Sequence, residues 1–163
     1  MDGEDFIKSV IKSDLQQRWS GSSHPAANTF HVVMNLPSLA IDFLQFFRGL
    51  LSAGEARRPP PVSQLPVIHC YTFSRAEAPT TDAAQMTAAA LGLASFDDLQ
   101  NHAVRVVRNV APGKEMLCVT FRLPWHILAA GERGMSAYSW CMCENQLRFP
   151  QILMVVRLFL GTL

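Results

Sequence analysis

The sequence has 163 residues, of which 49% are hydrophobic, enough to bury the core of one domain. Its formal charge of +1 excludes a protein that attracts nucleic acid or an anionic membrane through a global positive field, so any RNA contact has to be local. The longest apolar run, residues 152–163, is interrupted by Arg157 and is shorter than the roughly 18 residues that a membrane helix needs. We therefore expect no membrane segment.

The four cysteines favour a reducing compartment over a disulfide framework. Their spacing matches no zinc pattern, and two thiols close together in the sequence do not complete a tetrahedral site by themselves. We therefore predict no metal. The cysteines are Cys70, Cys118, Cys141 and Cys143.

The first half of the chain predicts a helix, a buried strand and a second helix. Residues 4–18 carry apolar side chains at helical spacing, which are Phe6, Val10 with Ile11, and Leu15. Residues 30–35, "FHVVMN", are apolar and β-branched without polar alternation, which favours a central parallel strand covered on both faces. A helix then begins at Pro37, because proline is tolerated in the first turn of a helix.

The next part of the chain predicts a second strand, a third helix and a β-hairpin. Residues 65–73, "LPVIHCYTF", form another buried strand, and residues 81–93 form an Ala-rich helix that ends near Gly92. In residues 103–123, two apolar runs flank "APGK", whose Pro-Gly pair suits a type II turn. Alternating strands and helices imply a parallel sheet, and the hairpin adds an antiparallel edge, so we predict an α/β fold.

An Asn-Leu-Pro turn joins the strand at 30–35 to the helix that follows it. Parallel α/β sheets bind their ligands at the carboxyl ends of the strands. The Asn35 side chain offers a carbonyl acceptor and an amide donor, while Pro37 holds Leu36 extended and leaves neighbouring carbonyls free. Such a turn suits a planar group with a carbonyl and an amino substituent, as on the edge of a nucleobase. The alternative is that Asn35 only caps the helix.

Three segments carry a family resemblance, "HVVMNLPSLAIDFLQFF", "LPVIHCYTFSR" and "VRVVRNVAPGKEMLCVTFRLP". They closely resemble the carboxyl-terminal part of the eukaryotic tRNA (guanine-37-N1) methyltransferases, and the opening "MDGEDFI" is similar to that family's segment after its third strand. The resemblance covers residues 1–124. It implies the carboxyl-terminal half of a Rossmann-like, class I S-adenosyl-L-methionine-dependent methyltransferase sheet. Residues 125–163 form a divergent apolar tail in which we recognise nothing.

The resemblance implies an enzyme that transfers a methyl group from S-adenosyl-L-methionine to N1 of guanosine 37, beside the tRNA anticodon. Asn35 and Pro37 match the family's catalytic Asn-X-Pro motif. Asp2, Gly3 and Asn35 match positions at the cofactor, with Asp2 near its adenine amino group. The family's Glu and Arg that assist the chemistry would precede residue 1, so we expect an incomplete fragment that is inactive when isolated.

Two alternatives differ from this function. The wybutosine-pathway tRNA aminocarboxypropyl transferase shares the fold and the cofactor, although its corresponding turn tends not to read Asn-Leu-Pro. The other alternative is a non-catalytic fragment that binds another protein. The resemblance implies the mitochondrial matrix, the cytoplasm and the nucleus as compartments, and the opening "MDGEDFIKSV" has no apolar signal segment.

Several polar side chains have two interpretations. The basic residues of the predicted hairpin either contact tRNA phosphates or protect an exposed edge strand by their charge. His31 and His69 lie in predicted strands, which favours packed or capping side chains over catalytic ones. The basic residues are Arg105, Arg108, Lys114 and Arg122.

Overall fold

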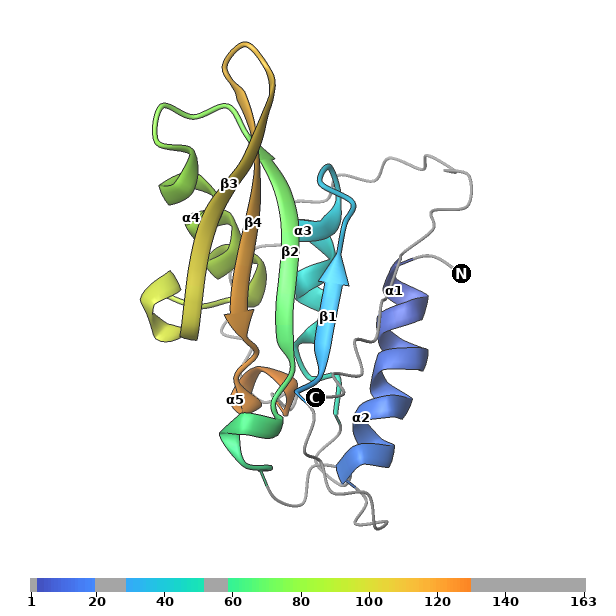
Figure 1. Ribbon diagram of the computed structural model, residues 1–163. Coiled ribbons are helices and arrows are strands. Elements are labelled where there is room, and N and C mark those ends of the chain that lie inside the picture. Colours follow the sequence, from blue (N-terminus) through green and yellow to red (C-terminus); the bar gives the residue numbers. More distant parts are fainter. Residues whose placement is uncertain (1–2, 20–28, 52–58, 130–163) are drawn as a thin grey trace, which may run out of the picture.

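The computed structural model describes residues 3–19, 29–51 and 59–129. These residues form a mixed α/β fold around a four-stranded sheet with the strand order β1-β2-β4-β3 (Figure 1). Asp2 and residues 130–163 of the predicted tail 125–163, with its two cysteines, lie outside the described residues. The strands are β1 (His31–Met34), β2 (Val67–Ser74), β3 (Gln100–Ala111) and β4 (Lys114–Arg122).

The sheet combines one parallel pair with an antiparallel hairpin. β1 and β2 are parallel and pair from His31 opposite Val67 to Met34 opposite Cys70. β4 is antiparallel to both β2 and β3. Gly113 between β3 and β4 has φ of 64°, the positive value that a type II turn requires at its third residue. The predicted hairpin is therefore confirmed.

One face of β1 packs into the core. Val32 and Met34 are buried, whereas His31 and Val33 are half-buried. Within the described residues β1 also ends the sheet. In the described part of the chain the helices that follow β1 and β2 lie side by side over a single face (Figure 1), so the predicted cover on both faces is not found among these residues.

The helices on that face begin at other residues than predicted. The helix after β1 consists of α3 (Ala40–Phe43) and a 3-10 continuation, η2 (Leu44–Phe47), so it begins at Ala40 and not at Pro37. The helix after β2 is α4 (Pro79–Leu91), with its proline in the first turn. Gly92 ends α4 with φ of 70°, which confirms the predicted glycine cap.

The first helix is continuous but contains a π segment. It comprises α1 (Gly3–Phe6), η1 (Ile7–Ile11) and α2 (Lys12–Trp19), which confirms the helix predicted over 4–18. Its buried stripe is Ile7, Ile11 and Leu15, whereas Val10 is 42% exposed. The prediction that Val10 shares the buried face is wrong, because a stripe with four-residue steps from Ile7 reaches only Ile11.

The remaining elements are short. They are η3 (Val62–Gln64) before β2, η4 (Phe96–Asp98) before β3, and α5 (Trp125–Leu128) after β4. Buried apolar side chains from the helices and strands form one cluster, in which Phe47 and Phe121 have no exposed surface. No helix in the described part of the chain is long and apolar enough to cross a membrane.

Candidate functional site at the carboxyl end of β1

Asn35 lies directly after the last paired residue of β1. Met34 is opposite Cys70 in β2, and the chain turns away from the sheet after Asn35. The Asn35 side chain is exposed, and it has no hydrogen-bond partner among the described residues. Its amide therefore keeps both its donor and its acceptor available to a ligand.

The backbone after Asn35 forms a tight turn into α3. The Leu36 carbonyl accepts hydrogen bonds from the N–H groups of Leu39 and Ala40, both at 2.8 Å. The expectation of a free carbonyl at Leu36 is therefore wrong, because this carbonyl starts the helix. The N-cap of α3 is Leu39 and no side chain caps the helix, so the alternative that Asn35 is the cap is also wrong.

Gly3 is buried at the start of α1, close to the helix that follows the turn. A Cβ atom on Gly3 would lie 2.7 Å from Cε2 of Phe43 in α3. Figure 1 shows the start of α1 at the same end of the sheet as the carboxyl end of β1. The structure therefore places Gly3 at the end of the molecule that carries Asn35, packed against α3.

We expect Gly3→Ala to destabilise the protein, because the new methyl group overlaps the Phe43 ring. Overpacking of this kind costs roughly 1–3 kcal/mol. The measurement is urea unfolding of the variant beside the double variant Gly3→Ala/Phe43→Leu, which removes the ring atoms that clash. Equal losses in the two variants would mean that contact with Phe43 is not the cause.

Sequence reasoning missed a polar cluster at the carboxyl end of β2. Ser74 is buried, its Oγ donates to Asp82 of α4 at 2.5 Å, and the same oxygen accepts from the Ala76 N–H at 3.1 Å. This cluster fixes the start of the loop between β2 and α4. The loop leaves the sheet at the carboxyl ends of the parallel strands β1 and β2, the end at which Asn35 also lies. The available signal was a serine ending a buried strand, with an acidic residue in the next helix.

A line of polar side chains crosses three strands. His31 Nδ1 lies 2.9 Å from His69 Nε2, and His69 Nδ1 lies 3.1 Å from Thr120 Oγ1. Burial, and in second place the charge of His31, lower the pKa of His69. Both imidazoles contact neighbouring side chains, which agrees with the prediction of packed histidines.

The two described cysteines are free thiols that stay protonated. Burial raises the pKa of the Cys70 thiol, and burial also raises the pKa of Cys118. The thiolate is the reactive form of cysteine, so neither side chain is a candidate nucleophile. No group of at least three His, Cys, Asp or Glu side chains that could hold a metal occurs in the described ranges.

Three of the four basic side chains of the hairpin fall into two groups, and the fourth, Lys114, lies with its Nζ over the ring of Phe73, 4.0 Å from the ring centroid. Arg122 Nη1 donates to the carbonyls of Val62, Ser63 and Leu65 at 2.8–3.1 Å, so this residue anchors the segment before β2. Arg105 and Arg108 on β3 are exposed. We therefore keep the interpretation as tRNA phosphate contacts for Arg105 and Arg108 of β3, and we drop it for Arg122.

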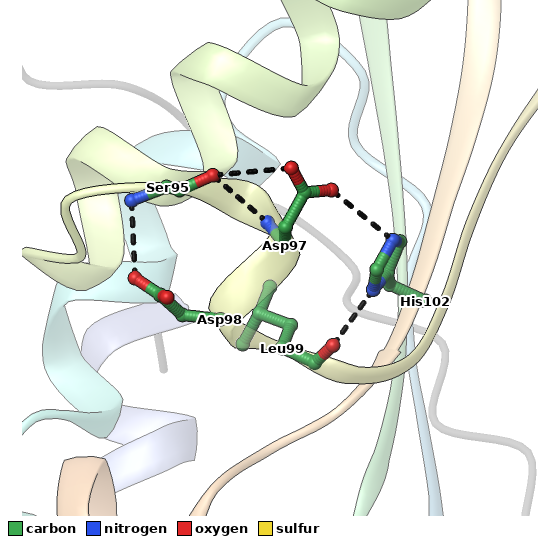
Figure 2. A network of polar contacts seen from close by, with 5 residues as sticks. All are labelled: Ser95, Asp97, Asp98, Leu99 and His102. Carbon is green, nitrogen blue, oxygen red and sulfur yellow. Dashed lines mark hydrogen bonds and ion pairs between the residues drawn. The ribbon is translucent and has the colours of Figure 1, made fainter.

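Figure 2 shows a second polar network, around η4 before β3. Ser95 caps η4, since its Oγ accepts from the Asp97 N–H and its own N–H donates to Asp98 Oδ2, both at 3.1 Å. His102 Nδ1 donates to the Leu99 carbonyl at 2.7 Å, and its Nε2 lies 3.7 Å from Asp97 Oδ1. Ser95 Oγ donates to Asp97 and not to His102, so these residues do not form a nucleophile–base pair.

A cavity of about 650 Å³ lies next to the same loop and is also separate from Asn35. Small side chains of α4, among them Ala84 and Ala88, line it together with Phe96 and Val104. Its lining includes no histidine, lysine or arginine. Its polar lining residues are Thr80, Thr81, Gln85, Ser95 and Asp97. We take the turn at Asn35 as the candidate site, because it lies at the carboxyl end of a parallel strand, where α/β sheets bind their ligands.

Comparison with known proteins finds relatives that align with most of the chain. No family model matches the chain. The chain is 44% identical over 124 residues to a mouse (Mus musculus) tRNA (guanine(37)-N(1))-methyltransferase, covering 76% of this chain and 23% of the relative. The human (Homo sapiens) protein of that name is 42% identical over 128 residues, with 78% and 24% covered. The Drosophila melanogaster protein is 36% identical over 127 residues, with 78% and 27% covered.

A solved structure, Trm5b from Pyrococcus abyssi, matches with a TM-score of 0.39 and 23% sequence identity, covering 56% of this chain and 24% of that one. The sequence relatives are more similar to this chain than the solved structure is, and the chain spans about a quarter of their length. This chain is therefore homologous to one part of the tRNA (guanine(37)-N(1))-methyltransferases.

Proposed function

We propose that this chain forms part of a tRNA (guanine-37-N1) methyltransferase and supplies the carboxyl-terminal half of its Rossmann-like, class I sheet. The observation that carries the proposal is the 44% identity to the mouse enzyme over 124 residues. The proposed partner is the anticodon region of tRNA, and the proposed cofactor is S-adenosyl-L-methionine. The compartments that we propose are those of the resemblance, the mitochondrial matrix, the cytoplasm and the nucleus.

The exposed amide of Asn35 fits a ligand with a mixed donor and acceptor edge. Guanine presents the carbonyl oxygen O6 and the amino group N2 on either side of N1, and an amide can donate to O6 or accept from N2 without covering N1, the atom that is methylated. When bound, S-adenosyl-L-methionine supplies a methyl group on a positively charged sulfur. In the proposed reaction the N1–CH3 bond would form as the S–CH3 bond breaks, with S-adenosyl-L-homocysteine as the leaving group and the N1 proton going to a base elsewhere in the enzyme. Asn35 would hold the target base in line with the methyl group, a task of orientation that lowers the barrier by fixing the reactants.

Pro37 and Gly3 have supporting roles in this proposal. Pro37 restricts Leu36 to an extended backbone, which fixes the direction in which Asn35 leaves the strand. Gly3 allows α1 to approach α3 closely, which brings the start of α1 toward the ligand side of the sheet. Asp2 precedes this contact and is proposed to accept a hydrogen bond from the adenine amino group.

The proposal is tested by exchange of segments. The aligned part of the mouse enzyme is replaced by the matching residues of this chain, and methyl transfer is measured on a tRNA with guanosine 37 and on the same tRNA with adenosine 37. We expect transfer to the first tRNA and none to the second. A folded chimera that transfers no methyl group would contradict the proposal and favour a non-catalytic fragment. Transfer of an aminocarboxypropyl group would favour the wybutosine-pathway enzyme.

We expect the exposed basic side chains of β3 to contact tRNA phosphates. The double variant Arg105→Gln/Arg108→Gln should weaken tRNA binding by the chimera. It should also reduce the slope of log K against log salt by about 0.7–0.9 for each phosphate that the protein no longer neutralises. The control is Arg48→Gln, which removes an exposed arginine next to Gly92. An unchanged slope in the double variant would leave protection of the sheet edge as the role of these arginines.

A further inference from the structure

The two histidines of the parallel pair form a direct contact between β1 and β2. Their nitrogens lie 2.9 Å apart, and their rings are stacked, with centroids 5.2 Å apart and an interplanar angle of 12°. His69 is held from its other side by Thr120 of β4 at 3.1 Å. The contact therefore joins β1, the end strand of the described sheet, to β2 and, through Thr120, to β4.

The contact between the two nitrogens has room for one proton. In a neutral pair, one imidazole donates this proton and the other accepts it, and a pair with a single added proton keeps the same arrangement. When both rings are protonated, each nitrogen carries its own hydrogen. Two N–H groups then point at each other, and two positive charges meet at hydrogen-bond distance, which breaks the contact.

We propose that the His31–His69 pair is a pH-sensitive clasp, which holds β1 in the sheet at neutral pH and opens when both imidazoles are protonated. β1 has four residues and pairs only with β2 within the described part of the chain. Few backbone hydrogen bonds therefore hold it, and the histidine contact adds to the attachment that the burial of Val32 and Met34 provides. Because β1 leads directly into Asn35, opening of the clasp displaces the candidate site.

The charged side chains on the elements around the clasp interact with other partners than the two imidazoles. Tyr71 of β2 and Cys118 of β4 interact with each other near this line of side chains, and Arg105 of β3 acts on Cys118 as a positive charge. Arg122 of β4 is a second permanent cation, directed at backbone carbonyls. On the side of the first helix, Arg18 of α2 lies over the ring of the residue before β1 and pairs with an aspartate of its own helix.

The sign of the pH effect follows from the pKa of His69, which lies below its ordinary value of about 6.5. The unfolded chain binds this proton more readily than the folded chain, so stability falls as the pH drops below about 6.5. Each unit by which the pKa is lowered reduces the folding constant by about tenfold once the pH lies below both pKa values.

The test is an NMR titration of the full chain from about pH 7.5 to 5, in the range where histidines change charge. It follows the imidazole signals and the exchange protection of the amides in β1 and β2. His31→Asn keeps a polar atom near the position of Nδ1 but cannot take up a proton. The control is His126→Asn, which removes an exposed histidine of α5 that makes no contact with the clasp.

We expect His69 to titrate below the ordinary value of about 6.5 and the protection of β1 to be lost in the same pH range. His31→Asn should raise the pKa of His69 and remove the pH dependence of the exchange protection of β1. His126→Asn should leave both unchanged. Should His31→Asn fail to fold, the titration of the unmodified chain decides alone. Protection of β1 that stays constant while His69 gains its proton would overturn the proposal. Because this readout needs no methyl transfer, it is independent of the proposed function.

Discussion

Asn35→Ala lowers the single-turnover rate of methyl transfer to guanosine 37 by about 10²-fold or more, measured in the chimera with the mouse enzyme. The reason is that Asn35 has the only side-chain amide in the turn after β1, and this amide makes no hydrogen bond within the described residues. Removing one oriented polar group from a reacting centre typically reduces the rate by about 10²–10³-fold. The stability of the protein should change little, because the side chain is exposed and does not cap α3.

Two further variants separate the amide from the shape of the turn. Asn35→Asp keeps the size of the side chain but loses its donor, so it should also be slow. Ser38→Ala changes another exposed polar side chain of the same turn and should keep the rate. If Asn35→Ala reacts as fast as the unchanged chimera, Asn35 has no part in the chemistry.

Arg122→Met lowers the free energy of unfolding by about 2–4 kcal/mol, because three backbone carbonyls lose a charged donor. Hydrogen bonds to a charged group contribute roughly 1.5–3 kcal/mol each. The two N–H groups of Nη1 are shared among the three carbonyls and two of the contacts are exposed, so the total is less than the sum of three such bonds. Methionine keeps much of the apolar stem of arginine, so the loss reports the hydrogen bonds more than the packing. The measurement is urea unfolding of the chain.

The matched control is Arg108→Met, which makes the same chemical change on the exposed edge strand β3. We expect this variant to unfold within about 0.5 kcal/mol of the unchanged chain, as is usual for surface positions. A similar loss in both variants would show that Arg122 does not anchor the segment before β2. Weaker tRNA binding by Arg122→Met without a loss of stability would restore its interpretation as a phosphate contact.

The features that the sequence predicts well are those that depend on neighbouring residues. The hairpin follows from two apolar runs around a Pro-Gly pair, and Gly113 has the positive φ that this turn needs. Gly92 ends α4 for the same kind of reason, since glycine enters the left-handed region without strain. The position of Asn35 at the carboxyl end of a strand also follows from local pattern, because the apolar run that includes Val32 and Val33 ends at Asn35, two residues before Pro37.

The features that the sequence does not predict depend on contacts across the chain. Arg122 bonds to carbonyls 57–60 residues away, and no local pattern distinguishes it from the exposed Arg108. The contact between His31 and His69 depends on the register of two strands that are 38 residues apart. The start of α3 at Ala40 depends on contacts over a shorter distance in the sequence. The Leu36 carbonyl accepts the first hydrogen bonds of the helix, so it is not free to accept one from a ligand.

The most direct test of the central claim is a crystal structure of the chimera with tRNA and the demethylated form of the cofactor, S-adenosyl-L-homocysteine. The claim is that the turn at the carboxyl end of β1 holds the target base. We predict that the Asn35 amide lies within hydrogen-bond distance, about 2.7–3.2 Å, of guanine 37. A guanine held by other side chains, with Asn35 facing solvent and Pro37 far from both ligands, would contradict the claim.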